Sequence, residues 1–348
     1  MSRTGQRVAV VLFNLGGPDT PGAVRPFLEN LFSDPAIIPA PGIVRRPLAS
    51  LIARTRARSA RANYAVMGGG SPLLANTRAQ ASALEALLRS RMPAADARVF
   101  IAMRHWRPTS EEAAAEVMAF APDRIVLAPL YPQYSTTTTA SSLRDWRLGY
   151  SGPGTSRTIC CWYDNAGFVE AHVEAITTVW EAAGRPKVRL LFSAHGLPQK
   201  VARSGDPYQW QVEATCAAIA RRLGKDWTCR VCYQSRVGPM KWLEPSTVGA
   251  ILEAREAKTG VLIDPVSFVS EHIETLVELD RDYAALAAAA GIAPFLRAPA
   301  VGVAPAFISG LASAVERALE AVGPIGPDGA ACRPGLTRCA LRDPELCH

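Results

Sequence analysis

The chain has 348 residues, of which 49% are hydrophobic and 20% are charged, and its formal net charge is +7. This length and composition exclude a disordered chain and suggest two domains of ordinary size. The N-terminus has only a short apolar run and no signal-peptide cleavage pattern, which predicts a cytoplasmic protein. The long uncharged stretch at 298–315 contains Pro299 and Pro305 and few large aliphatic side chains, so we do not expect it to cross a membrane.

Short β-rich runs alternate with longer segments of helical pattern along the whole chain. The runs lie at 8–15, 98–103, 124–130, 158–163, 187–195, 229–235 and 260–266. Such alternation is typical of an α/β protein whose parallel sheets are covered by helices on both faces. Seven strands, with an eighth too weak to assign, approach two four-stranded units, and the spacing is consistent with two similar α/β halves.

Helix starts and linkers divide the chain further. Thr20 followed by Pro21, and Thr109 or Ser110 ahead of two glutamates, are predicted helix N-termini. The predicted domain boundary lies in the Gly-rich and Pro-rich segments 149–157 or 182–187. We therefore expect a first domain at 1–155, completed by a C-terminal helix at about 305–322, a second domain at 156–304, and an irregular tail at 323–348.

The positive charge is concentrated in one region. No acidic residue lies between Asp34 and Glu85, whereas that interval holds the arginines 45, 46, 54, 56, 58, 61 and 78. The segment at about 36–60 is an apolar, proline-broken stretch that continues into a helical pattern with Leu48, Leu51 and Ile52 on one side. This lip suits a membrane surface or an amphipathic anion, and an ordinary surface helix stays an alternative. Nucleic acid is not expected, because aromatic residues do not alternate with the basic ones.

Polar and aromatic residues follow six of the predicted strands. These strand exits are 14–18, 103–108, 131–139, 193–198, 233–239 and 266–274. Because ligands of open α/β sheets bind beyond the carboxyl ends of the strands, we expect the exits to contribute to one cleft.

Three closely spaced carboxylates lie in the last strand exit and in the segment that follows it. Glu271, Glu274 and Glu278 lie three and four positions apart, so an α-helix would place them on one face. No Lys or Arg lies between them along that line. Because like charges at this spacing repel, the row predicts a positive binding partner.

The exit segments resemble the ferrochelatase family. The motifs LGGP, GGGSPL, YPQYS, SAHGLP, GDPY, QSRVGPMKWL and EHIETLVELD occur in the family's order between about residues 8 and 320. The resemblance implies two Rossmann-like domains and a lyase that inserts Fe(II) into protoporphyrin IX with release of two protons, the terminal step of haem biosynthesis. It also implies a soluble or peripheral membrane enzyme, here on the inner face of the membrane; a homodimer stays open.

The resemblance assigns the centre of the site to His195 and Glu274. A neutral imidazole and a carboxylate can each bind iron or accept a pyrrole proton, and the division of these two roles stays open. Glu271, His272 and Glu278 would extend a polar path along the same segment.

The other matching motifs imply contacts to the porphyrin, which is a flat apolar ring with two propionates. Expected wall residues are Leu15, Tyr208, Met240 and Trp242, and expected polar contacts are Arg56, Arg104 and Ser135. His105 stands where the family usually has a Tyr, which puts its role in doubt. Leu15 and Gly16, without a nearby Tyr, favour protoporphyrin over coproporphyrin. Residues 68–73 lack the Lys of a phosphate loop and are expected to form a tight turn.

The eight cysteines are not expected to form disulfides in a cytoplasmic protein. Cys229 and Cys232 lie in a predicted strand on opposite faces and are interpreted as buried thiols. Cys332, Cys339 and Cys347 lie in the irregular tail. The resemblance implies a [2Fe-2S] cluster bound by these three and an internal cysteine. Since Thr136 occupies the usual internal position, Cys160 or Cys161 is the expected fourth ligand. A zinc site that uses His348 or an internal cysteine, or free thiols, are the alternatives.

Two other functions remain open at this point. A non-catalytic haem or porphyrin carrier could use the same cleft but would have no use for a carboxylate row. A cobalt or nickel chelatase for a more acidic tetrapyrrole would favour a more basic pocket without an apolar lip.

Overall fold

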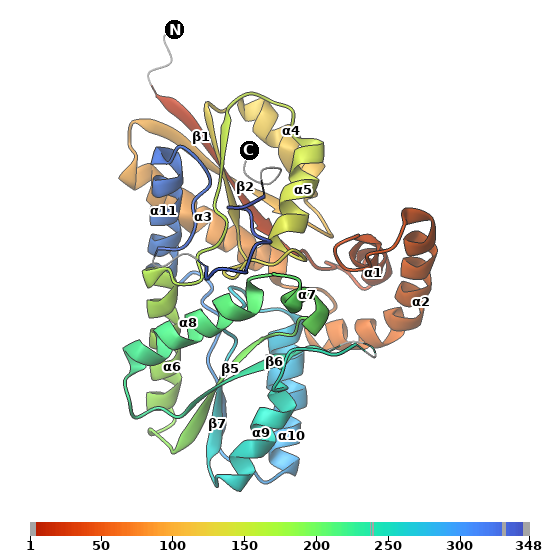
Figure 1. The fold of residues 1–348 in the computed structure, drawn as a ribbon, viewed down its shortest axis with the longest axis vertical. Helices are drawn as coiled ribbons and strands as arrows, with labels where there is room; N and C mark the ends of the chain where they lie inside the picture. Colours follow the sequence, from red (N-terminus) through yellow and green to blue (C-terminus); the bar gives the residue numbers. More distant parts are fainter. Residues whose placement is uncertain (1–4, 237, 239, 329–331, 344–348) are drawn as a thin grey trace. The chain divides into compact units, whose positions relative to one another are not determined.

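The structure is a computed structural model, and it describes residues 5–343 except 237, 239 and 329–331 (Figure 1). The chain forms two compact units. Among the described residues, the first contains 5–161, 312–326 and 339–343, and the second contains those within 162–311 and 327–338. Each unit is built on one four-stranded parallel sheet, as the alternating sequence pattern predicts.

The first unit is built around strand β1. Its sheet has the order β2-β1-β3-β4, with β1 at Gln6–Asn14, β2 at Ala95–Met103, β3 at Arg124–Pro129 and β4 at Thr155–Thr158. Val10 of β1 pairs with Val99 of β2 and Val126 of β3. β1 is buried from Val8 to its end, because a central parallel strand is covered on both faces and is therefore apolar without alternation.

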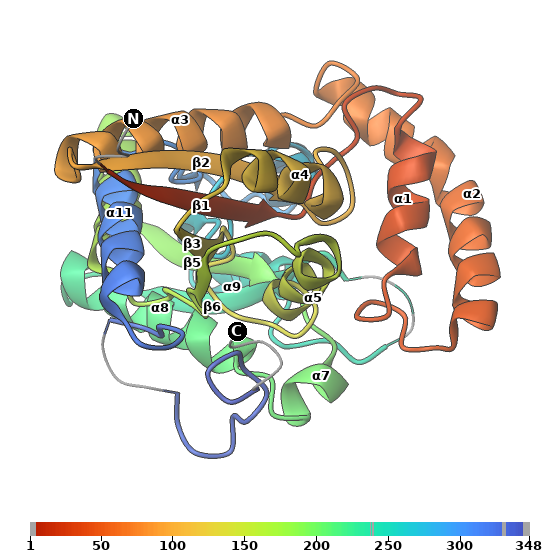
Figure 2. The same cartoon turned by 90° about the horizontal axis from the view of Figure 1, so that it is seen from above.

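Five helices lie entirely within the described residues of this unit. They are α1 at Val24–Ser33, α2 at Gly42–Val66, α3 at Leu73–Arg91, α4 at Ser110–Phe120 and α5 at Thr139–Gly149. Helix α3 lies on one face of the sheet and α5 on the other (Figures 1 and 2). Helix α2 packs beside α1 and buries small side chains, among them Ala49, Ala53 and Ala57. Its opposite side is left to solvent.

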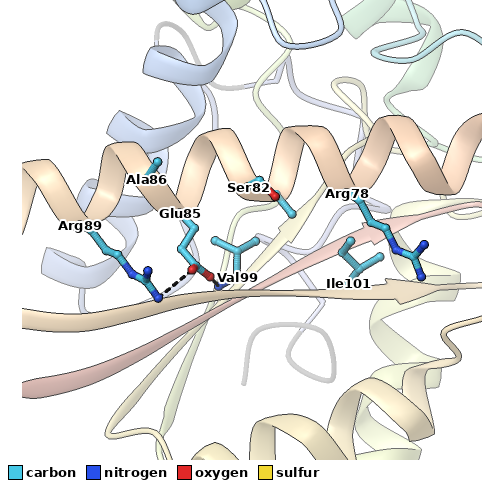
Figure 3. Close-up of a pocket in the computed structure, with 8 residues that line it drawn as sticks. Arg78, Ser82, Glu85, Ala86, Arg89, Val99 and Ile101 are labelled. Atoms are coloured by element: carbon cyan, nitrogen blue, oxygen red, sulfur yellow. Dashed lines mark hydrogen bonds and ion pairs between the residues drawn. The ribbon is translucent and has the colours of Figure 1, made fainter.

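The outer edge of β2 is covered by side chains of α3 (Figure 3). The Val99 N–H donates to Glu85 Oε2 at 2.8 Å, and Arg89 Nε donates to the Ala97 carbonyl at 3.3 Å. Glu85 and Arg89 are themselves ion-paired at 2.7 Å. This ion pair crosses the groove of about 400 Å³ between α3 and β2. Because its side chains already bind the Val99 N–H and the Ala97 carbonyl, they disfavour pairing of this edge strand with another strand.

The second unit has the sheet order β6-β5-β7-β8. Its strands are β5 at Val188–His195, β6 at Cys229–Gln234, β7 at Gly260–Asp264 and β8 at Phe295–Arg297. Its helices are α6 at Ala166–Ala182, α7 at Gln199–Arg203, α8 at Tyr208–Leu223, α9 at Thr247–Glu256, a π-helix η1 at Glu274–Tyr283, and α10 at Ala284–Ala289. Helix α11, at Pro305–Glu320, begins in this unit and ends in the first.

Alternate residues of β5 separate two apolar cores in the second unit. Leu190 and Phe192 pack with residues of α6 and α8. Leu191 faces the other way, toward α9, α10 and the π-helix. This two-sided burial follows from the period of two along a strand, and it fixes the π-helix against the sheet through Leu279 and Tyr283.

Most of the predicted elements are confirmed, with differences at boundaries. The seven predicted strands are present, although the one expected at 158–163 lies at Thr155–Thr158, and the weak eighth strand is β8. Thr109 is a helix N-cap with a complete capping box. The predicted helix start at Thr20 is wrong, since Thr20 accepts the Ala23 N–H in a turn and α1 begins at Val24. The turn predicted at 68–73 is confirmed by positive φ angles at Gly68 and Gly69.

In the part of the chain that the structure describes, no helix combines the length and apolarity that a membrane crossing requires. The prediction for 298–315 is consistent with this finding.

Candidate active site

The polar residues of the second unit converge on the carboxyl ends of β5 and β6. His195 is the last residue of β5 and pairs in register with Gln234, the last residue of β6. The following Gly196 donates its N–H to the Gln234 carbonyl at 2.8 Å. A Cβ at position 196 would lie 2.6 Å from that same carbonyl, so only glycine permits the two strand ends to approach this closely.

His195 and Glu274 form a hydrogen-bonded pair. His195 Nδ1 lies 2.7 Å from Glu274 Oε2, and the two side chains are 42% and 22% exposed. Tyr208 donates its hydroxyl to the His195 carbonyl at 3.0 Å and so fixes the end of the strand. The predicted central pair is thus brought together in one unit, with access to solvent on the imidazole side.

The pair stabilises opposite charges. Burial lowers the pKa of His195, but the charge of Glu274 and its hydrogen bond outweigh burial and raise that pKa above 6.5. Burial likewise raises the pKa of Glu274, but the charge and the hydrogen bond of His195, together with smaller contributions that include the Ser235 hydrogen bond, outweigh burial and lower the pKa to about 2. Each side chain therefore favours the charged form of the other. A proton on His195 is stabilised without loss of the Glu274 charge.

Ser235 connects two of the carboxylates. Its hydroxyl lies within hydrogen-bonding distance of Glu274 Oε2, at 3.0 Å, and of Glu278 Oε2. Its backbone N–H donates to Glu278 Oε1 at 3.0 Å. Ser235 has a φ of 60°, a left-handed conformation that is uncommon for a residue other than glycine. The turn aims both donors of one residue at the π-helix.

Glu278 receives further donors from both sides. Gln234 Nε2 donates at 3.1 Å and the Tyr283 hydroxyl at 2.6 Å. Burial, and then the Glu278 charge, raise the pKa of Tyr283, so the phenol stays a donor. Four donors therefore surround the Glu278 carboxyl group.

Glu271 is bound by a different cation. Arg297, at the end of β8, places Nη1 2.5 Å from Glu271 Oε1. The Ala300 N–H donates to the same oxygen at 2.9 Å. Although burial raises the pKa of Glu271, the charge of Arg297 together with the hydrogen bonds from Arg297, Thr275 and the Ala300 N–H outweighs burial and lowers the pKa below 4.5. Glu271, the first carboxylate of the row, is therefore paired with a cation from β8, which lies far along the sequence.

The winding of the segment differs from the prediction. The sequence spacing predicts an α-helix, whereas Glu274–Tyr283 is a π-helix with i→i+5 hydrogen bonds. The prediction that the carboxylates line one α-helical face is wrong in this respect. Glu271 lies ahead of the helix and contacts Arg297, while Glu274 and Glu278 contact the ends of β5 and β6.

His272 lies at the start of this segment against an aromatic ring. Its imidazole centroid is 4.6 Å from that of Phe268. Burial lowers the pKa of His272 below 6.5 and outweighs the opposing charges of Glu274 and Glu271. His272 is therefore a neutral imidazole, and its Nδ1 has no hydrogen-bond partner among the described residues.

The loop that carries Met240 and Trp242 is tied to the residues after His195. Pro198 forms a β-bridge with Trp242, and Leu243 donates its N–H to the Leu197 carbonyl at 3.0 Å. The Trp242 ring lies near Gly196, next to His195. Met240 is exposed. Tyr208, Met240 and Trp242 thus belong to the same unit as the central pair.

Arg104, of the first unit, is engaged by acidic partners. Its guanidinium contacts Asp34 at 3.0 Å and Asp145 at 3.5 Å, and its Nε donates to Ser141 Oγ at 2.7 Å. The adjacent His105 is buried, and burial together with the Arg104 charge lowers its pKa to about 3. His105 is therefore a neutral, enclosed residue.

The remaining predicted contacts of the first unit lie in different surroundings. Leu15 is half-buried and its carbonyl accepts the His105 N–H. Ser135 is buried, with its Oγ 2.9 Å from Thr137 Oγ1. Arg56 is exposed, with its guanidinium 5.9 Å from the centroid of the Phe32 ring. Their roles toward a porphyrin stay predictions.

Three thiols of the first unit lie in contact. Cys160 is hydrogen-bonded to Cys161 and to the tail residue Cys339, and all three are buried. The hydrogen bond with Cys161 raises the pKa of Cys160 well above its ordinary value. Cys332 belongs to the second unit, where Gln211 Nε2 donates to its sulfur at 3.2 Å. Cys347 and His348 lie outside the described residues. Within the described ranges, no group of three or more His, Cys, Asp or Glu side chains is arranged to hold a metal ion.

Sequence reasoning missed the donors that surround the carboxylates. They are Gln234, Ser235, Tyr283 and Arg297. The first two stand directly at the end of a predicted strand, which is a usable signal. Tyr283 and Arg297 carry no such signal, because only the winding of the helix and the pairing of β8 bring them close.

Comparisons with known proteins agree with one another. The family model for ferrochelatase matches residues 7–319. A ferrochelatase of Phenylobacterium zucineum is 58% identical over 97% of this chain and 98% of its own length. A ferrochelatase of Caulobacter vibrioides is 56% identical with the same coverage. Among solved structures, SirB from Bacillus subtilis with Fe3+ has a TM-score of 0.50 at 12% identity, covering 90% of this chain and 95% of that one. That likeness supports the fold alone.

The charge on Glu274 should control the titration of His195. In metal-free protein, NMR titration of the ring should give a pKa above 6.5, and Glu274→Gln should lower it below 6.5, because burial remains while the opposing charge is lost. The matched control is Glu253→Gln on the surface, which should leave the His195 midpoint in place. An unchanged midpoint in Glu274→Gln would refute the coupling.

Proposed function

The chain belongs to the ferrochelatase family, whose lyase reaction inserts iron into protoporphyrin IX, and from this premise we propose that His195 and Glu274 form the centre of that reaction. The observation that carries this proposal is the 2.7 Å contact between His195 Nδ1 and Glu274 Oε2 at the carboxyl end of β5. Fe(II) and the porphyrin are substrates.

The chemistry requires two pyrrole protons to leave as the ferrous ion enters. A proton transferred to the imidazole is stabilised by Glu274, whose lowered pKa keeps the carboxylate charged. We therefore assign proton acceptance to His195 and charge stabilisation to Glu274. The same carboxylate, with Glu278 behind Ser235, provides a negative environment that attracts Fe(II), which prefers oxygen and imidazole ligands.

His272 and Glu271 are assigned to the polar surroundings of this centre. The neutral imidazole of His272 can accept a proton or a metal ion, and its Nδ1 is available among the described residues. Tyr208, Met240 and Trp242 supply apolar surface in the same unit, which suits the flat face of a porphyrin. Leu15, Arg56, Arg104 and Ser135 are proposed as contacts from the first unit. Of these four residues, Arg104 has the weakest support as a porphyrin contact, because its charge is already paired with Asp34.

An assay of turnover tests directly whether His195 and Glu274 form the catalytic centre. Protein, Fe(II) and protoporphyrin IX are mixed without oxygen, and loss of porphyrin fluorescence is followed together with haem absorption. His195→Ala and Glu274→Gln should each lower kcat by at least about 100-fold, since each removes an acid–base or electrostatic contribution of that order. Glu253→Gln is the surface control. Full activity in either site variant would refute the centre, and stoichiometric binding without turnover by the unaltered chain would favour a carrier.

We further propose that the chain holds a [2Fe-2S] cluster. The contact of Cys160 with Cys161 and with Cys339 supports it, because a tail cysteine lies beside Cys160, one of the two candidate internal ligands. The chemistry of four thiolates suits such a cluster, and binding would replace the thiol protons. Cys339 and one of the two internal cysteines would hold it, with Cys332 and Cys347 as the other proposed ligands. It would have a structural or sensory role, because iron insertion transfers no electron.

Loss of one ligand should remove the cluster. Protein purified without oxygen should show visible iron–sulfur absorption and about two inorganic sulfides, as this cluster type requires. Cys339→Ser should lose both signals, whereas Cys229→Ser, which alters a half-buried thiol of the second unit, should keep them. Absence of both signals from the unaltered chain would refute the cluster.

We also propose that α2 contacts a membrane surface. Ile43 and Leu51 are 85% and 59% exposed, and their spacing of eight places them near one side of the helix with Pro47 between them. The exposed Arg54 and Arg58 continue this side toward the C-terminus. An apolar end followed by cations suits the interface of an anionic bilayer.

Charge placed on the apolar end of α2 should weaken membrane binding. Cosedimentation with vesicles of anionic phospholipid should recover the unaltered chain, and Ile43→Asp with Leu51→Asp should reduce the bound fraction several-fold, because the buried apolar area is lost. Leu148→Asp is the matched control, since Leu148 is 90% exposed on α5. Equal loss in the control would contradict a role specific to α2.

A further inference from the structure

Arg297 binds two acidic side chains on either side of Glu274. Its Nη1 lies 2.5 Å from Glu271 Oε1, and its Nε and Nη2 lie 2.7 and 2.5 Å from the two oxygens of Asp280. The side chain of Arg297 is only 13% exposed. A planar guanidinium that makes a bidentate contact with one carboxylate and a third bond to another is held in a single geometry.

One partner precedes the π-helix and the other lies within it. Glu271 lies ahead of the helix, whose first residue is Glu274, whereas Asp280 belongs to it. Arg297 therefore ties the segment that enters the helix to a residue inside it, with Glu274 between the two contacts.

A contact inside the helix depends on the π winding. Tyr283 donates to Glu278, five positions earlier, at 2.6 Å. Residues five apart are about 140° apart around an α-helix but roughly 50° apart around a π-helix. Since π-helices are rare and found mostly where function requires them, such side-chain contacts are a physical reason for this winding to persist.

From these contacts we propose that Arg297 is a positioning residue for iron insertion, which holds the segment Glu274–Tyr283 in its π winding and so keeps Glu274 against His195. The proposal rests on the assignment of His195 and Glu274 as the centre. Arg297 acts through Glu271 and Asp280 and is not assigned any contact with the porphyrin or the iron. Glu271 then serves chiefly as an anchor of the carboxylate segment.

Two variants of Arg297 test whether it positions the catalytic segment or only stabilises the fold. Arg297→Gln should lower kcat on the order of 100-fold, the usual effect of a displacement of about 1 Å in a catalytic group. It should leave the KM for protoporphyrin IX within about twofold, because substrate contacts are kept. Arg297→Lys should recover part of kcat, since an ammonium retains the charge but cannot make the three-point contact.

Hydrogen exchange measured by mass spectrometry reports the winding itself. Amides of 274–283 should exchange faster in Arg297→Gln, while peptides of β5 and α8 keep their protection. The matched control is Arg281→Gln, which removes an exposed arginine of the same helix, paired with its neighbour Asp282. The control should preserve both kcat and exchange.

Several results would overturn the proposal. One is an Arg297→Gln protein with kcat within threefold of the unaltered chain and unchanged exchange at 274–283; another is equal effects in Arg281→Gln. If Arg297→Gln does not fold, Asp280→Asn removes one arm of the clamp, and wild-type values in that variant for both measurements would refute it. Activity that survives in His195→Ala would refute the proposed centre instead, while exchange would still decide whether Arg297 holds the winding.

Discussion

The repulsion among the three carboxylates is the constraint on which the second unit is organised. Negative charges this close, and partly withdrawn from water, persist only if each has its own donors. Glu271 has Arg297 and a backbone N–H, Glu274 has His195 and Ser235, and Glu278 has Gln234, Ser235 and Tyr283. Apart from Tyr283 of the π-helix and the Ala300 N–H, the donors come from three strand ends, so the sheet, rather than the helix alone, keeps the row charged.

The parallel sheet supplies these donors because all its strands end at one edge. The order β6-β5-β7-β8 places His195 between the end of β6 and the end of β7. The chain leaves β7 toward the carboxylate segment, and β8 returns with Arg297 at its last position. The close approach at Gly196 and the positive φ of Ser235 are local costs of this convergence, and such strain commonly accumulates at functional sites.

Sequence pattern could predict the strands, the cap at Thr109 and the residues at the strand ends, because each depends on neighbours in the chain. It could not predict the π winding. The spacing of Glu271, Glu274 and Glu278 fits an α-helix equally well, and the choice between the two is made by Arg297 and by the ends of β5 and β6. For the same reason the position of Cys339 beside Cys160 has no signal in the tail itself, since a long-range contact determines it. The sequence-based prediction was thus wrong where the site depends on tertiary contacts.

The winding also bears on how His195 can act. A pair in which the proton stays on the imidazole is stable, because the Glu274 charge is available at 2.7 Å. The same stability would hinder release of that proton if Glu274 had no other donor. Ser235 lies within hydrogen-bonding distance of both Glu274 and Glu278, so it can compensate Glu274 when the imidazole becomes neutral again. A helix that presents two carboxylates to one hydroxyl therefore makes the pair able to accept a proton and to lose it, which repeated insertion of iron requires.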